Sequence, residues 1–110
     1  MVDEQKYENS FETISFAGTA KSAAMEAIAA GSRGDFDEAE QLLKQAEECM
    51  LEAHHLQTNM ITQEMRGNSV EVNIILLHAM DHLSMAQTAM DMAAVILQLQ
   101  KEVKQLKEEK

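Results

Sequence analysis

The chain has 110 residues, enough for one domain, and its 19 acidic and 9 basic residues give a net charge of -10. This charge repels the phosphates of nucleic acids and anionic membrane surfaces, so we expect neither a nucleic-acid partner nor insertion into a membrane. A single cysteine, Cys49, excludes an internal disulfide and a cysteine-based zinc site, and the polar N-terminus lacks the order of a signal peptide, so we expect a cytoplasmic protein.

Three long helices are predicted in a single domain over residues 1–110, at about 10–31, 35–66 and 69–108, with the first nine residues frayed. The first helix carries an apolar stripe at helical spacing. Its members are Phe11, Ile14, Ala17, Lys21, Ala24, Met25 and Ile28.

Cap signals mark the starts of the second and third helices. Asp35 followed by Glu38 has the spacing of a capping box, which predicts that the second helix begins there. Asn68 or Ser69 is expected to cap the third helix, which then begins near Val70.

The third helix carries two apolar stripes, and we call the first of them the seam because its members step by threes and fours as in a coiled coil. The seam consists of Ile74, Leu77, Asp81, Met85, Thr88, Met92, Val95, Leu99, Val103 and Leu106. The second stripe consists of Leu76, Met80, Leu83, Gln87, Met90, Ala94 and Leu97. Two other helices cover only part of such a surface. We therefore expect an all-α, antiparallel, up-down-up three-helix bundle whose uncovered stripe meets further copies of the chain.

Asp81 is the one charged residue of the seam. An ionised carboxylate buried alone costs several kcal/mol, and no lysine or arginine lies within one turn of it. Around a symmetry axis, copies of Asp81 would converge and could hold a hard cation through their oxygens. The alternative is that Asp81 faces water at the edge of the stripe.

His78 and His82 lie one helical turn apart on either side of Asp81, and three interpretations compete. In the first interpretation they complete the packing of the helix. A metal site would need further ligands, for which His54 and His55 are available, but the single Glu52-x-x-His unit falls short of the two that di-iron bundles use.

The third interpretation is phosphoryl transfer, because a neutral imidazole is both a nucleophile and a phosphoryl acceptor. The sequence contains neither a phosphate-binding P-loop nor the kinase signatures, so the phosphoryl group would have to come from another protein rather than from bound ATP. The main alternative is a helical oligomerisation or interaction module whose histidines are structural.

Three stretches of the chain carry a family resemblance: Ala30 to Ala39, Glu52 to Thr58, and Val70 to Leu83 with its His78-Ala-Met-Asp-His82 motif. Together they resemble the enzyme IIA component of the lactose/cellobiose (chitobiose, lichenan) family of the bacterial sugar phosphotransferase system, over about residues 10–105.

The resemblance implies a homotrimer of three-helix subunits with a nine-helix, coiled-coil-like core. It implies a phosphotransferase component in which His78 accepts a phosphoryl group from HPr and passes it to the cognate IIB protein, for uptake of a lactose/cellobiose-type disaccharide. Asp81 corresponds to the family's metal ligand, usually for Mg²⁺ on the threefold axis, and His82 is expected to contact the phosphoryl group. Met80 replaces a glutamine that is common in the family, and His54 is expected to make an interhelical contact.

Overall fold

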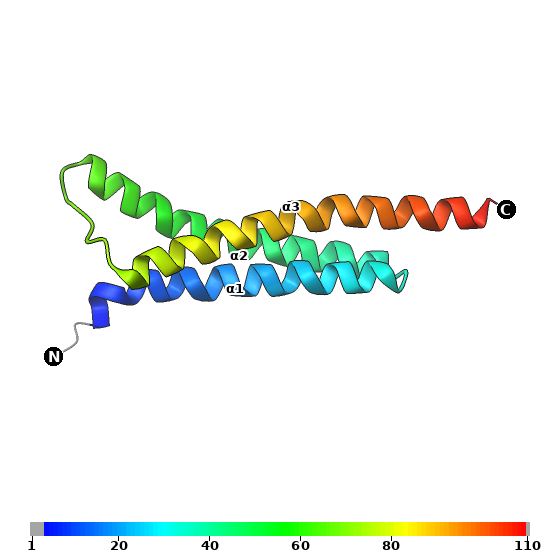
Figure 1. Cartoon of the computed structure of the whole chain (residues 1–110), viewed down its shortest axis with the longest axis horizontal. Helices are drawn as coiled ribbons and strands as arrows, with labels where there is room; N and C mark the ends of the chain where they lie inside the picture. Colours follow the sequence, from blue (N-terminus) through cyan, green and yellow to red (C-terminus); the bar gives the residue numbers. More distant parts are fainter. Residues whose placement is uncertain (1–3, 110) are drawn as a thin grey trace.

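The computed structural model describes residues 4–109, with side chains from Tyr7 onward, and it consists of three helices (Figure 1). Helix α1 spans Glu4–Ser32, α2 spans Phe36–Met65 and α3 spans Ile74–Glu108. Helices α1 and α3 run in the same direction and α2 runs in the opposite direction, in an elongated bundle measuring 65 × 28 × 19 Å. The predicted all-α, up-down-up arrangement is therefore confirmed for the subunit.

Helix α1 is the centre of the bundle, since it contacts α2 and α3 far more than those two contact each other. The C-terminal part of α2 diverges from α3, and the C-terminal end of α3 extends beyond the other helices (Figure 1). Helix α1 also begins at Glu4, so the prediction of frayed residues is wrong for 4–9, while residues 1–3 lie outside the described part of the chain.

The turn between α1 and α2 is built differently from the predicted capping box. Asp35 occupies the N-cap position of α2, but its side chain makes no capping hydrogen bond. Instead, the Arg33 guanidinium lies 3.4 Å from Asp35 and 3.5 Å from Glu38. Gly34 adopts a φ of 85°, a left-handed conformation that glycine accepts without the steric cost of a Cβ.

The predicted start of α3 is wrong by several residues. Asn73 is the N-cap, and its Oδ1 accepts a hydrogen bond of 2.8 Å from the backbone N–H of Leu76. Asn68 follows the end of α2, and its side-chain amide donates back to Gln63 of that helix. The backbone N–H of Val70 donates to the Glu64 carboxylate, so the start of the connection is held against α2 rather than continuing into a helix.

Alanine dominates the core of the subunit. Of the 16 buried hydrophobic residues in the described part of the chain, 12 are alanines. Small side chains let helix backbones approach closely, which explains a tight bundle with few bulky core residues. The larger residues of the predicted α1 stripe lie outside this core: Phe11 and Met25 are each more than half exposed.

The two predicted stripes of α3 have different environments. Leu83, Met90 and Leu97 of the second stripe are buried against α1 and α2. All eight apolar residues of the seam, by contrast, are exposed in the subunit, at 43% to 85% of their full accessible surface. The subunit thus leaves uncovered the stripe that the sequence predicted would meet other copies.

Candidate functional site

His78 and His82 face each other on the surface of α3. Their Nε2 atoms lie 3.1 Å apart, and the rings meet edge to face at an angle of 87° with centroids separated by 4.4 Å. His78 is exposed and His82 half-buried, while Ala79 between them is fully buried and fixes the inward face of the helix. Residues four apart lie on one side of a helix, so the regular geometry of α3 is enough to produce this pair.

The contact between the two Nε2 atoms requires one N–H donor and one lone-pair acceptor, because two lone pairs or two N–H groups would repel each other. When His82 donates, His78 keeps its Nε2 lone pair and carries its own proton on Nδ1. In that tautomer the His78 Nε2 lone pair accepts the His82 N–H and becomes free for an electrophile when this hydrogen bond opens. One imidazole can then accept the electrophile while the other supplies a hydrogen bond.

Asp81 lies beside the two histidines but on the seam. Its side chain is exposed, and no cation pairs with it in the part of the chain that the structure describes. Leu77 and Met85, one turn away on either side, are exposed apolar residues. The carboxylate therefore interrupts an apolar surface and in the isolated subunit faces solvent, which is the alternative left open by the sequence.

Met80 turns away from the histidines. Its sulfur accepts a hydrogen bond of 3.3 Å from the side-chain amide of Gln57 on α2. Residues two apart in a helix point to nearly opposite sides, so Met80 faces α2 while His78 faces outward. Helical periodicity alone gives no information about which α3 residue Gln57 meets.

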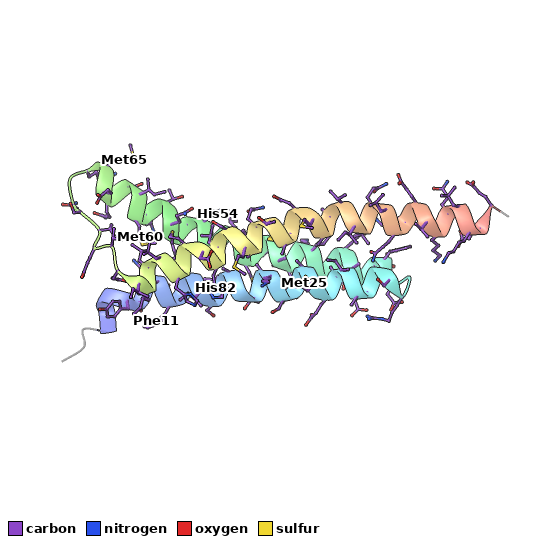
Figure 2. All side chains as sticks on the ribbon, viewed as in Figure 1. Phe11, Met25, His54, Met60, Met65 and His82 are labelled. Atoms are coloured by element: carbon purple, nitrogen blue, oxygen red, sulfur yellow. The ribbon has the colours of Figure 1, made fainter. Side chains whose placement is uncertain are left out.

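The histidines of α2 do not join this site. His54 is half-buried on α2, apart from His82 on α3 (Figure 2), and His55 is exposed. Across the described residues, no three side chains of histidine, cysteine, aspartate or glutamate gather so that they could hold a metal ion within one subunit. Nor does any helix in this part of the chain combine the length and hydrophobicity that a membrane span requires.

Comparison with known proteins identifies the family. Residues 8–101 match the family described as "PTS system, Lactose/Cellobiose specific IIA subunit". The chain belongs to this family. The resemblance inferred from the three sequence motifs is therefore confirmed, and the protein is a IIA component, a phosphocarrier of the phosphotransferase system for lactose/cellobiose-type sugars.

Individual relatives agree with this assignment. The IIA protein is 43% identical over 93 residues to the lichenan-specific phosphotransferase enzyme IIA component of Bacillus subtilis (strain 168), covering 84% of each chain. It is 37% identical over 91 residues to the lactose-specific EIIA component of Staphylococcus epidermidis, covering 83% of this chain and 88% of that one.

The fold is shared with a solved relative. The crystal structure of the cellobiose-specific enzyme IIA from Bacillus anthracis superposes with a TM-score of 0.89 at 36% identity, covering 94% of both chains. Membership of the phosphotransferase system also defines two protein partners for this IIA component, namely HPr and the IIB protein.

Proposed function

We propose that His78 is the residue of this IIA component that carries the phosphoryl group. The observation that supports this most directly is the pairing of an exposed His78 Nε2 with the Nε2 of His82 at 3.1 Å. A nitrogen that transfers a phosphoryl group between two proteins must be reachable by both, and His78 is exposed where His82 is half-buried.

In the proposed step, the Nε2 lone pair of His78 attacks the phosphorus of phospho-HPr in line. The new P–N bond forms as the bond between phosphorus and its carrier atom on HPr breaks, and the electron pair of that bond stays on HPr. Transfer to IIB repeats the exchange, with His78 as the leaving group. The N–H of His82 donates first to the His78 lone pair and then to an oxygen of the phosphoryl group, which offsets part of its negative charge.

The test is incubation of the protein with phosphoenolpyruvate, enzyme I and HPr. We expect one acid-labile phosphoryl group per subunit, loss of that group in His78→Ala, and its retention in His55→Ala, which removes an exposed histidine of α2. Phosphorylation of His78→Ala to the wild-type level would overturn the proposal. A protein that forms oligomers but accepts no phosphoryl group would be the helical interaction module considered from the sequence.

We also propose that the subunits assemble as a homotrimer in the cytoplasm, with three copies of α3 packed along the seam. Eight exposed apolar residues in one continuous stripe support this assembly, because water-facing stripes of this length are rare on monomers. The three-helix subunits would then form the nine-helix, coiled-coil-like core.

A divalent cation, most simply Mg²⁺, fits the donors that such a trimer would bring together. Within the described part of one subunit, Asp81 has no two further potential ligands gathered around it, so a complete site requires several copies. Three carboxylates are hard oxygen donors, and their mutual repulsion inside an apolar seam requires a compensating positive charge. The cation would neutralise the Asp81 side chains and would take no part in the chemistry at His78.

A further inference from the structure

A shallow apolar groove runs between α1 and α3 alongside the seam. Its volume is about 510 Å³, and it is lined chiefly by Lys21, Met25 and Ile28 from α1 and by Met85, Ala89 and Met92 from α3. Met85 and Met92 also belong to the seam, and Met25, labelled in Figure 2, is 53% exposed. Groove and seam therefore form one continuous apolar surface that the subunit itself leaves open.

Lys21 is the one charged side chain that lines this groove. It is half-buried, and within the described residues it makes no hydrogen bond or ion pair. An ammonium group covered by an apolar partner without an anion would lose its hydration with no compensation. A partner that closes the groove should therefore bring a carboxylate to Lys21.

The geometry of α3 defines which residues a neighbouring copy would present. The Gln100 side chain donates to the backbone oxygen of Ile28, and this contact places α1 on one flank of the seam. The contact of Met80 with Gln57 places α2 on the other side. In a threefold arrangement each copy of α3 turns its α1 flank toward the opposite flank of the next copy.

Asp91 lies on that opposite flank, between the seam and the α2 side. At 100° per residue, it is about 80° from Asp81 in the direction away from α1. In a threefold assembly its side chain would therefore project toward the α1 helix of the adjacent copy. Its Oδ1 accepts a hydrogen bond of 3.0 Å from Gln87, and the carboxylate is otherwise exposed. Oδ2 remains available for a further partner.

The two residues also lie at the same height along the bundle. Helices α1 and α3 are parallel, and Gln100 donates both to Ile28 and to Ser32 on α1. Asp91 precedes Gln100 by nine residues on α3. On α1, Lys21 likewise precedes Ala30, the midpoint between Ile28 and Ser32, by nine residues. Threefold symmetry keeps all copies at equal height, so one copy's Asp91 comes level with the next copy's Lys21.

We infer that the α1–α3 groove is closed by the α3 helix of an adjacent copy and that Lys21 pairs there with Asp91 of the partner subunit. This inference rests on the proposed trimer and adds to it the flank that each copy presents. It makes the interface heterologous, with three identical Lys21–Asp91 pairs per trimer. Each pair supplies the carboxylate that the apolar groove lacks.

A charge-reversal cycle tests the pairing by sedimentation equilibrium of the full chain in Mg²⁺ at low salt. Because three pairs act together, Lys21→Glu and Asp91→Lys should each lower the trimer association constant by about tenfold or more. The double variant should recover to within about threefold of the wild type. Lys21→Met, which removes the charge without reversing it, should lower the association constant less than Lys21→Glu does. Circular dichroism should show unchanged helix content in all four variants.

Lys44→Glu is the matched control, because it makes the same change in net charge at an exposed position of α2. Suppose that the wild type is a trimer. If Lys21→Glu then lowers the association constant no more than Lys44→Glu does, or if the double variant does not recover, the Lys21–Asp91 pairing is wrong although the trimer itself stands. A wild type that stays monomeric would overturn both the trimer and the pairing. Phosphorylation of His78 is measured separately and does not depend on either result.

Discussion

The Nε2 atoms of His78 and His82 lie 3.1 Å apart on the surface of α3, so one N–H group must lie between these two nitrogens. In the proposed function this relationship separates the roles of the two histidines, although they are chemically identical and only one turn apart. His78 is the more exposed and is suited to meet other proteins. His82, half-buried beside it, is suited to hold the proton.

Replacing His82 should therefore slow phosphoryl transfer without abolishing it. His82→Ala removes the donor to the His78 Nε2 and to the phosphoryl oxygens, and a positioned proton donor contributes on the order of 10²-fold to such a step. We expect His82→Gln, which keeps an N–H donor, to retain more activity than His82→Ala. Rapid-quench measurement of the rate of transfer from phospho-HPr checks this ranking of the three proteins. Equal rates for wild type and His82→Ala would contradict the role of His82 as a donor.

Placing a charge in the seam should dissociate the trimer. Leu99→Glu puts three carboxylates into the proposed interface with no cation nearby, at a cost of ~3 kcal/mol or more per subunit. Leu51→Glu is the matched control: the same substitution on α2 at an almost equal exposure, 54% against 53% for Leu99. Size-exclusion chromatography with light scattering should show a monomer for Leu99→Glu and a trimer for Leu51→Glu. Trimers in both variants would place the interface elsewhere.

Removing divalent cations should weaken the trimer through Asp81. In the wild type, EDTA leaves three carboxylates uncompensated, so the trimer should dissociate at a higher protein concentration than in Mg²⁺. Asp81→Leu replaces the carboxylates by apolar groups, so this variant should stay trimeric and become insensitive to EDTA. Sedimentation velocity at several concentrations compares the two proteins. A wild type that EDTA does not affect would disprove an axial cation. A monomeric Asp81→Leu would contradict the expected trimer of this variant and would show that bonds between Asp81 and the cation dominate the interface.

The helix cap at Asn73 offers a test of the fold. Asn73→Ala removes the acceptor of the Leu76 N–H and should lower the free energy of unfolding by about 1 kcal/mol. Asn68→Ala removes only an exposed hydrogen bond to Gln63, so its effect should stay below about 0.5 kcal/mol. Both free energies are measured by urea unfolding in the Leu99→Glu background. This background is expected to be monomeric, so assembly makes no contribution. A larger loss in Asn68→Ala would contradict the observed start of α3.

Helical periodicity was sufficient to predict the three helices and the seam, because a stripe along one face depends only on residue spacing. Every apolar seam residue from Ile74 to Leu106 proved to be exposed. Periodicity was less informative about α1, where stripes of large residues and of alanines run side by side. The predicted stripe combined residues of both kinds. Packing buries its alanines, Ala17 and Ala24, and leaves Phe11 and Met25 more than half exposed.

Caps were predicted poorly because several residues could serve. Asn68, Ser69 and Asn73 are all good N-cap residues, and the choice of Asn73 depends on how the connection is tied to Glu64 on α2. At the other turn, Arg33 competes for the carboxylates of Asp35 and Glu38 that the capping box would have used. The closeness of His78 and His82 was predictable, since the two residues lie one turn apart on α3. The contact of Met80 with Gln57 joins two helices, and only the packing of α2 against α3 brings those two residues together.

The most direct test of the account is to locate the phosphoryl group on the protein. After phosphorylation by phosphoenolpyruvate, enzyme I and HPr, fragments kept at alkaline pH can be sequenced by tandem mass spectrometry, which separates His78 from His82. The account predicts one phosphoryl group per subunit, on His78. A phosphoryl group found on His82, His54 or His55 instead would contradict it.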